Sequence, residues 1–472
     1  MKNPRGSKRG VMGGAALPLL ALTAQAQDAE ELKLRFEALN ERLQSIEDRQ
    51  SAGDLLRVQW KDGLRLTSPD SKFDLKIGGR IHFESQWNEG DESLEESRRF
   101  DGDANDQTKS KLIGPLEDGF ELRRARLYLS GTMYQHFEFK WQYDFAKGTV
   151  GHKDVYGGLI NLGDWIPNFR FGHMYEPFGL DAMTSSNDST FIERSAISNA
   201  FAPNRNPGFL FWKNFKFDSD GKAVERVTWA VGAFREDASD NSVATGDGAY
   251  NFTARVAGTP YYAAEGKKLV HVGAAVTRRK PAGRGSESVT YAAKPEVDLF
   301  GNFVNSGAMK EADVDWRCGT ELAAVWNKWS LQGEYMRART DMNSGSALDH
   351  PEFSGWYLQG SWMLTGEARR YKTAEATFQN PKPWSNAFDN GGMGAWELAL
   401  RWSTIDLSEG SEANGGVQGG ELESVTLGLN WYLNANAKVM WDLSRIDLDD
   451  LDPAFGSGGN VTVAQMRWQY AF

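Results

Sequence analysis

Apolar and polar residues alternate with a period of two through most of this chain, from Ser71 to its last residue. In the stretch FEFKWQYDF, residues 137–145, every odd position is aromatic and every even position is charged or an amide. Successive side chains of a β-strand point to opposite faces, so each such stretch has one apolar and one polar face. The pattern predicts an all-β protein whose strands separate two different environments.

The distribution of aromatic residues favours a membrane barrel over a soluble β-sandwich, which is the alternative. The polar faces carry charges at almost every position, and the apolar faces end in Trp, Tyr or Phe. This arrangement is typical of transmembrane strands with apolar residues outside, polar residues inside and aromatic girdles at both interfaces. The mean hydropathy of −0.54 argues against membrane-spanning helices after the N-terminus. A transmembrane strand, however, needs only about 9–11 residues, and only every second one must be apolar.

We predict a closed antiparallel barrel of sixteen strands with both chain ends on the periplasmic side. The strands are expected at 71–87, 119–133, 137–146, 154–162, 168–176, 208–217, 224–235, 249–258, 268–279, 313–327, 329–339, 353–364, 393–406, 421–432, 437–448 and 460–472. The last strand alternates to a carboxyl-terminal Phe472, which resembles the assembly signal of bacterial outer-membrane proteins. A barrel of this width encloses an aqueous channel. The link at 365–392 is long for a periplasmic turn, so eighteen strands is the alternative count.

The first 26 residues resemble a secretory signal peptide. A basic segment, residues 2–9, precedes a short apolar one, residues 11–22, and Ala24-Gln25-Ala26 supplies an A-x-A cleavage site. The apolar segment is too short to span a bilayer, so we expect cleavage rather than a membrane anchor. The mature chain is expected to comprise a periplasmic helix at 27–52, a linker at 53–70 and an outer-membrane barrel at 71–472.

The helix carries a heptad repeat. Within 28–50, apolar residues recur at spacings of four and three, at Leu32, Phe36, Leu39, Leu43 and Ile46. A helix this short is marginal in water, so its apolar stripe needs a partner. We expect a short coiled coil between subunits of a trimer, and packing against the end of its own barrel is the alternative.

Composition excludes several other functions. One cysteine, Cys318, leaves no intramolecular disulfide, and the six histidines show no paired-ligand spacing, so we expect no metal site and no cofactor. An enzyme barrel would need a Ser-His or Asp-His pair at one rim, and the histidines show no such grouping, so we expect no catalytic residues. The formal net charge of −11 argues against nucleic acid as a partner. Much of that charge lies in the helix and in the first long loop, 88–118, so the lumen need not be acidic.

Several segments resemble the phosphate-selective porin family, the outer-membrane porins O and P. The strand motif RRARLYLSG at 123–131 and the late motif GAWELALRWS at 394–403 are two of them. The more specific set lies in one region, with EPFGL at 176–180, TSS at 184–186, FIER at 191–194 and NAFAP at 199–203. This set resembles the third extracellular loop of the family, and the motifs together are spread over the whole barrel.

The resemblance implies a trimer of sixteen-stranded barrels in which the third loop folds inward to narrow the pore. It also implies that basic residues conduct anions. On this sequence it places Arg124 and Arg126 on the pore wall, and Arg194 and Arg205 on the inserted loop. The family's central lysine cluster is not located in this sequence, so the preferred anion stays open.

Taking the polar face of each strand as the lumen extends this set. Basic residues outnumber acidic ones about two to one over the first nine predicted strands, and the excess vanishes over the rest. The candidate pore-wall residues are Arg80, Arg124, Arg126, Lys140, Arg170, Arg226 and Arg255, and the candidate constriction residues are Arg194 and Arg205. A confined passage focuses such a field and concentrates counter-ions, and the guanidinium fork binds two oxygens of an oxyanion. Ion pairing that only stiffens the wall, as Arg80–Glu84 or Lys140–Glu138, is the alternative role of each residue.

The sequence therefore predicts an outer-membrane porin for passive diffusion of small anions such as phosphate and related oxyanions, in contact with outer-membrane lipids and assembled as a homotrimer. A weakly selective general-diffusion porin is one alternative. A structural protein that tethers the envelope through its helix is another. A sugar porin is less favoured, because Trp212 and Tyr357 alone do not make an aromatic track.

Overall fold

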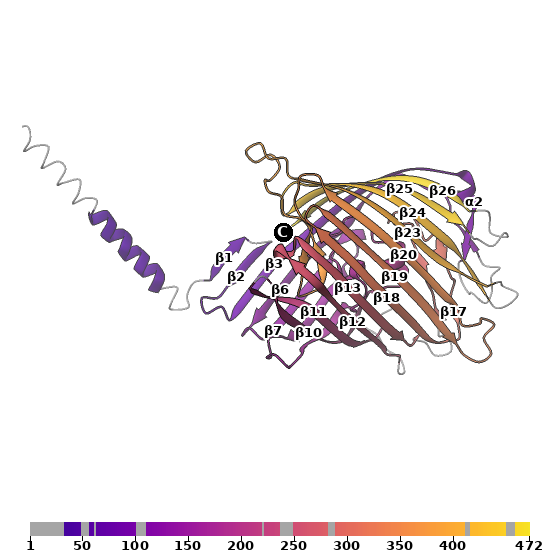
Figure 1. Cartoon of the computed structure of the whole chain (residues 1–472), viewed down its shortest axis with the longest axis horizontal. Helices are drawn as coiled ribbons and strands as arrows, with labels where there is room; N and C mark the ends of the chain where they lie inside the picture. The colour runs from indigo at the N-terminus through magenta and orange to yellow at the C-terminus, as the bar shows by residue number, and fades with distance from the viewer. Residues whose placement is uncertain are drawn as a thin grey trace, which may run out of the picture.

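A computed structural model describes residues 33–48, 56–60, 63–100, 110–219, 221–236, 249–281, 288–410, 416–449 and 458–472 (Figure 1). Sixteen antiparallel strands close into a barrel, and the closing pair is β26 with β3, where Ala471 lies opposite Arg80. The barrel strands are β3 (Phe73–Gly90), β6 (Gly119–Met133), β7 (Phe137–Asp144), β8 (Gly151–Leu159), β9 (Asn168–Tyr175), β10 (Arg205–Ser219), β11 (Lys222–Phe234), β12 (Asn251–Ala263), β13 (Lys268–Arg279), β18 (Ala312–Trp326), β19 (Trp329–Met342), β20 (Glu352–Met363), β23 (Ala395–Glu409), β24 (Val417–Tyr432), β25 (Ala437–Asp449) and β26 (Gly459–Ala471). The predicted count of sixteen is confirmed, and the alternative of eighteen is wrong for the closed barrel.

A hairpin lengthens one side of the barrel at the end that carries Phe472, which we call the periplasmic end as the sequence predicts. Strands β1 (Arg57–Trp60) and β2 (Leu64–Thr67) lie within the segment expected to be a linker, and β2 pairs with the first part of β3. Phe472 donates its main-chain N–H to Gly79 O at 3.0 Å, and Gly79 N–H donates to Phe472 O at 2.8 Å. A Cβ atom on Gly79 would lie 2.7 Å from the Phe472 ring, so glycine is needed for this close approach. The carboxyl-terminal aromatic residue is thus part of the closing strand pair.

The outer surface of the barrel is apolar, as the alternation predicts. Trp141 and Phe120 leave 54% and 68% of their surfaces exposed, a degree of exposure that suits a lipid environment. Short turns join the strands at the periplasmic end, with Tyr134, Gln135 and Asn327 in the left-handed region at φ values of 51°, 63° and 56°. Within the described ranges no helix is long and apolar enough to cross a membrane. The N-terminal helix, residues 33–48, is exposed along its whole length.

Short elements decorate the rim and the turns. They are α2 (Glu92–Glu96), β4 (Arg98–Phe100), β5 (Ser110–Leu112) and the 3₁₀ turns η1 (Ala146–Gly148) and η2 (Ala264–Gly266).

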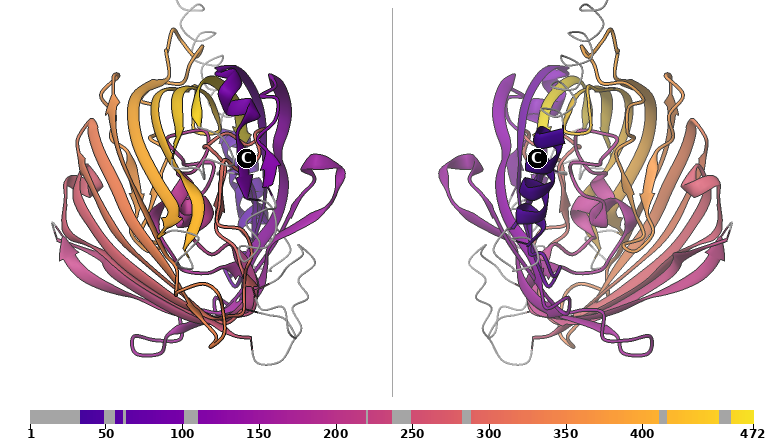
Figure 2. Two further views of the ribbon diagram at one scale, coloured as in Figure 1. Left: turned by 90° about the vertical axis from the view of Figure 1, so that its right-hand side faces the viewer. Right: turned by 90° about the vertical axis from the view of Figure 1, so that its left-hand side faces the viewer.

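Two long loops fold into the lumen and fill one side of it. The first, residues 176–204, is called the inserted loop and carries α3 (Leu180–Met183) and α4 (Ala196–Ala200). The second, residues 288–310, carries β14 (Ser288–Val289), β15 (Ala292–Ala293), β16 (Val304–Asn305) and β17 (Met309–Lys310). Figure 2 shows the short helical segment of the inserted loop inside the ring of strands in both views.

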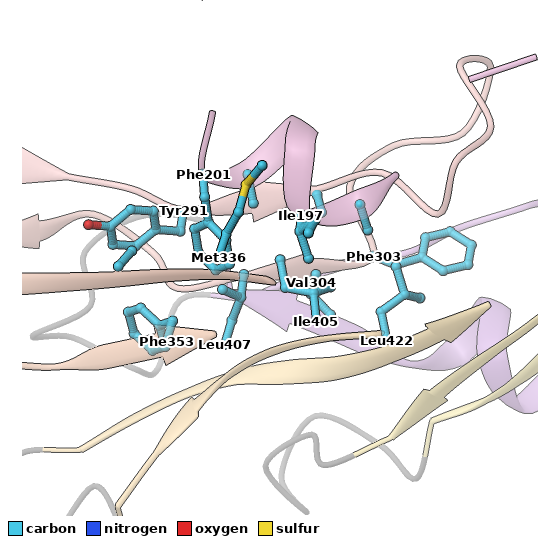
Figure 3. Close-up of a cluster of buried hydrophobic side chains, with 14 of the residues drawn as sticks. Ile197, Phe201, Tyr291, Phe303, Val304, Met336, Phe353, Ile405, Leu407 and Leu422 are labelled. Carbon is cyan, nitrogen blue, oxygen red and sulfur yellow. The ribbon is translucent and has the colours of Figure 1, made fainter. Parts of the chain in front are cut away.

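These loops pack against inward-facing apolar residues of β19, β20 and β23–β26. We call these strands, together with β18, the far wall. Phe201 of the inserted loop and Phe353 of β20 flank the Tyr291 ring at 5.7 and 5.5 Å, as Figure 3 shows. Further inward residues of this core are Met336, Ile405, Leu407, Leu422, Ile446 and Val463. One half of the lumen is therefore a packed apolar core, and a polar-lined cavity lies on the side of β3 and β6–β12.

A third segment enters the lumen from the periplasmic end. The link between β20 and β23 forms the hairpin β21 (Arg370–Lys372) and β22 (Thr377–Gln379). Phe378 packs beside Leu180 of the inserted loop, and Asn380 N–H donates to Asp188 Oδ1 of that loop at 2.9 Å. The length of this link, which raised doubt about the strand count, is explained by its inward fold.

We predict that Phe353→Ala lowers the thermal stability of the barrel. Phe353 is 2% exposed and contacts the Tyr291 ring. Truncation therefore leaves a cavity and should lower the free energy of unfolding by about 3–5 kcal/mol. The measurement is the temperature at which the folded band disappears on unboiled gels. Phe252→Ala is the control, because Phe252 is 53% exposed on the outer surface and its removal opens no cavity. An equal shift for both variants would contradict a packed lumen core.

Candidate functional site

A cavity of about 480 Å³ lies between the inserted loop and the wall formed by β3 and β6–β12. Eight basic side chains line it, against three carboxylates, Glu138, Asp154 and Glu375. The basic residues are Arg80, Arg124, Arg126, Lys140, Arg170, Arg194, Arg205 and Arg255. The charge asymmetry expected for the first half of the strands is therefore concentrated around one passage.

Strand register places like charges side by side in this wall. Arg80 on β3 lies directly opposite Arg126 on β6, and Arg126 lies opposite Asp144 on β7. Like charges at facing positions destabilise a sheet. Arg126 Nε donates to Asp144 Oδ2 at 2.7 Å, so one of the two charges is compensated by the next strand.

Most of the other cations also have a carboxylate partner. Asp154 accepts from Lys140 at 2.6 Å and from Arg205 at 2.7 Å, and Arg170 donates to Glu138 at 2.8 Å. Asp154 alternates with Tyr156 on β8, and both side chains line the cavity.

The two pairs named from the sequence, Arg80–Glu84 and Lys140–Glu138, are both replaced by others. Lys140 takes Asp154, and Glu84 accepts from Arg467 Nε at 2.7 Å. The partners come from neighbouring strands, since Arg467 on β26 lies directly opposite Glu84 and Asp154 lies on β8 beside the strand of Lys140.

Two guanidinium groups in the cavity have no carboxylate within ion-pair distance among the residues that the structure describes. Arg80 donates to Ser186 Oγ at 3.0 Å and, more weakly, to Ser185 Oγ at 3.4 Å, and its Nε has no partner there. Arg194 donates to Tyr175 Oη at 3.2 Å and to the main-chain oxygens of Asp181 and Thr184. The least compensated positive charge therefore lies where the inserted loop approaches the wall.

Of the remaining candidates, Arg205 and Arg255 line the cavity and Arg226 lies outside it. Arg255 pairs with Glu321 at 2.7 Å and also donates to Ala376 O, in the turn between β21 and β22, at 3.0 Å. Arg205 is the first residue of β10 rather than a residue of the loop itself. Arg226 does not line the cavity. It donates instead to Thr259 O, an oxygen near the bulge where Pro260 interrupts the ladder of β12 with β13.

Two aromatic residues considered for a sugar track have different positions. Trp212 lines the cavity, and its ring lies 4.5 Å from the Arg170 guanidinium, whose other neighbour is Tyr156 at 4.0 Å. Tyr357 is buried under the inserted loop and donates to Glu334 Oε2 at 2.6 Å. The hairpin of β21 and β22, which brings Glu375 to the cavity, was not predicted from the sequence, although the length of the link was a signal for it.

A closed sixteen-stranded barrel with an inserted loop and a basic passage is the architecture of a porin. The chain matches the family "Phosphate-selective porin O and P" over residues 97–472, and it belongs to that family. It is 27% identical to Porin O of Pseudomonas aeruginosa over 453 residues, which cover 88% of this chain and 92% of that protein. Among solved structures, the anion-selective porin from Comamonas acidovorans has a TM-score of 0.51 at 12% identity and covers 85% of this chain and 100% of its own.

The structural likeness supports the fold, and the family defines the class. The protein is an outer-membrane channel for anions, and family membership indicates a channel rather than an enzyme.

We predict that Arg80→Gln weakens anion preference. The change removes an uncompensated charge from the lining of the cavity, so the anion-to-cation permeability ratio should fall by about two- to fivefold. The measurement is the zero-current potential in planar bilayers under a KCl gradient. Arg226→Gln is the matched control, because Arg226 lies outside the cavity and should leave the ratio unchanged. Equal effects of the two changes would contradict the position of the passage.

Proposed function

We propose that the protein lets small anions, such as phosphate and related oxyanions, diffuse passively through the cavity beside β3 and β6–β12. The observation that carries this proposal is the lining of eight cations against three carboxylates. A narrow passage with walls of low dielectric constant focuses such a field and concentrates anions.

The arrangement suits conduction rather than tight binding. Conduction needs sites that an ion can leave, and a carboxylate beside a guanidinium group weakens its hold on a passing anion. Arg126, Arg170 and Arg205 have such partners. Arg80 and Arg194, together with the hydroxyl groups of Ser185 and Ser186, supply the least compensated donors. An oxyanion would lose its hydration gradually along this row and regain it at the other end.

Weakly selective general diffusion is the second candidate. It is favoured by the same ion pairs, because a cation that is fully compensated by its neighbour contributes little net field. The two candidates differ in whether the pore binds phosphate at the uncompensated arginines.

We predict a zero-current potential that favours chloride over potassium in planar bilayers, and a chloride current that millimolar phosphate reduces. The first result follows from the net positive lining, and the second from two-oxygen binding by a guanidinium group. Gluconate at the same concentration is the control, because it carries one negative charge without a phosphate group. Preference for potassium would contradict the proposed function. Chloride preference without block by phosphate would favour general diffusion.

We further propose that residues 1–26 direct export of the precursor and that the mature protein assembles as a homotrimer through its N-terminal helix. The support is the exposed stripe of Phe36, Leu39, Leu43 and Ile46. Each of these side chains is between 49% and 64% exposed in the single chain. A stripe of this kind at heptad spacing is stabilised by copies of itself.

Deletion of residues 28–50 should leave single-channel conductance unchanged and lower the temperature at which the trimer band dissociates on gels. The reason is that the helix lies outside the barrel but supplies a contact between copies. Replacement of Glu37 and Glu41 by alanine is the control, because these residues lie between the stripe positions. An unchanged dissociation temperature with increased detergent sensitivity of the cells would support an envelope tether instead.

A further inference from the structure

Three buried carboxylates hold the inserted loop by its main chain. Glu334 on β19 accepts N–H groups from Leu180 at 2.6 Å and Asp181 at 2.8 Å. Asp442 on β25 accepts Ile192 N–H at 2.8 Å, and Glu296 in the second inserted segment accepts Ala196 N–H at 3.0 Å. All three are buried, and none of them lines the basic cavity.

The far wall also donates to the carbonyl groups of the same loop. Lys438 Nζ donates to Ser189 O at 2.8 Å, Asn430 to Thr190 O at 2.8 Å, and Arg401 to Glu193 O at 3.0 Å. The loop is thus fixed by side chains that match its main-chain donors and acceptors one by one. Burial of these groups without partners would cost about 1–3 kcal/mol each, so losing any one of the contacts would destabilise this position of the loop.

Of these three carboxylates, Glu334 accepts two main-chain N–H groups of the loop, and Asp442 and Glu296 accept one each. Its Oε2 atom also accepts the Tyr357 hydroxyl at 2.6 Å. Gly179, just before the two bound N–H groups, has a φ of 72°, and a Cβ atom there would lie 2.9 Å from Met336 Cε and 3.0 Å from Glu334 Oε1. Glycine is therefore required where the loop turns over this carboxylate.

The turn held by Glu334 carries the cavity residues. Arg194 Nε donates to Asp181 O at 3.0 Å, and Arg194 Nη2 donates to Thr184 O at 2.9 Å. The Thr184 hydroxyl in turn donates to Leu180 O at 2.7 Å. Ser185 and Ser186, which contact Arg80, follow directly. A shift of the Leu180–Asp181 peptide would therefore move the uncompensated guanidinium of Arg194 and the hydroxyls beside Arg80 together.

We propose that Glu334 is a positioning residue for ion selectivity, a carboxylate whose loss weakens anion preference. The proposal rests on the proposed anion function. Simple charge counting requires the opposite result, because removing a carboxylate from the lumen of an anion channel should strengthen anion preference. The sign of the change therefore separates a role in position from a role in charge.

The test is Glu334→Gln in planar bilayers, with Glu138→Gln as the matched control. The amide keeps one oxygen for one main-chain N–H and turns its own N–H groups toward the remaining donors, so the loop loses part of its hold. The anion-to-cation permeability ratio should fall by about two- to fivefold, with larger open-channel current fluctuations. Glu138→Gln removes a carboxylate that lines the cavity beside Arg170, so it should raise the ratio.

A rise or no change for Glu334→Gln would overturn the proposal. If the wild-type channel prefers potassium, the proposed function fails, and the current fluctuations still decide whether Glu334 holds the loop. If Glu334→Gln does not fold, Gly179→Ala takes its place, because an added Cβ atom presses on the same contact without changing any charge. Gly179→Ala should lower the ratio and increase the fluctuations, and wild-type behaviour of a folded Gly179→Ala channel would overturn the proposal.

Discussion

The structure depends on the closure of its sheet. A strand in the hydrocarbon core of a membrane has no water to satisfy its main-chain groups, so an open edge is excluded and the last strand must pair with the first. Here β26 pairs with β3 along eleven residues, and Phe472 completes the ladder with Gly79. Arg467 and Glu84 are facing residues of that pair and bond at 2.7 Å, so the closing strands are also joined on the lumen side. Closure creates the lumen, and everything functional is arranged within it.

The lumen is divided between a dry half and a wet half, and the division explains where the charges lie. The inserted loop presents its apolar residues, such as Ile197 and Phe201, to the core of the far wall. Its main chain is satisfied there by Glu334, Asp442 and Glu296, whose charges are used in binding N–H groups. Glu334 on β19 and Asp442 on β25 are thereby kept out of the lining of the basic cavity. The cations of the first half remain on its surface, so a chain with a net charge of −11 encloses a positive channel.

Local periodicity predicted the strands well, because lipid on one side and water or polar contacts on the other impose a period of two on each strand separately. The predicted bounds of the strand at 119–133 match β6 to the residue. Side-chain partners were not predictable in this way, since they come from other strands and loops. Arg123, the unpaired residue at the bulge of β6, bonds Glu193 of the inserted loop, and Asp154 bonds Lys140 of β7 and Arg205 of β10. The assumption of a wholly polar lumen failed at Ile405, Leu407 and Ile446, which point inward because loops from elsewhere in the chain cover them. Apolar residues at inward positions were the available signal, but what covers them is decided by tertiary structure.

The pairing of cations with carboxylates in the passage is better understood as a condition for transport than as a defect in selectivity. An array of bare guanidinium groups would repel itself and would hold a divalent oxyanion too tightly to release it. Asp144, Asp154 and Glu138 reduce both effects, since each lowers the local positive potential without reversing it. In the proposed pathway the few groups left uncompensated are Arg80 and Arg194, and the inserted loop contacts the first and carries the second. On this proposal, anion preference depends on the placement of the inserted loop as much as on the number of charges.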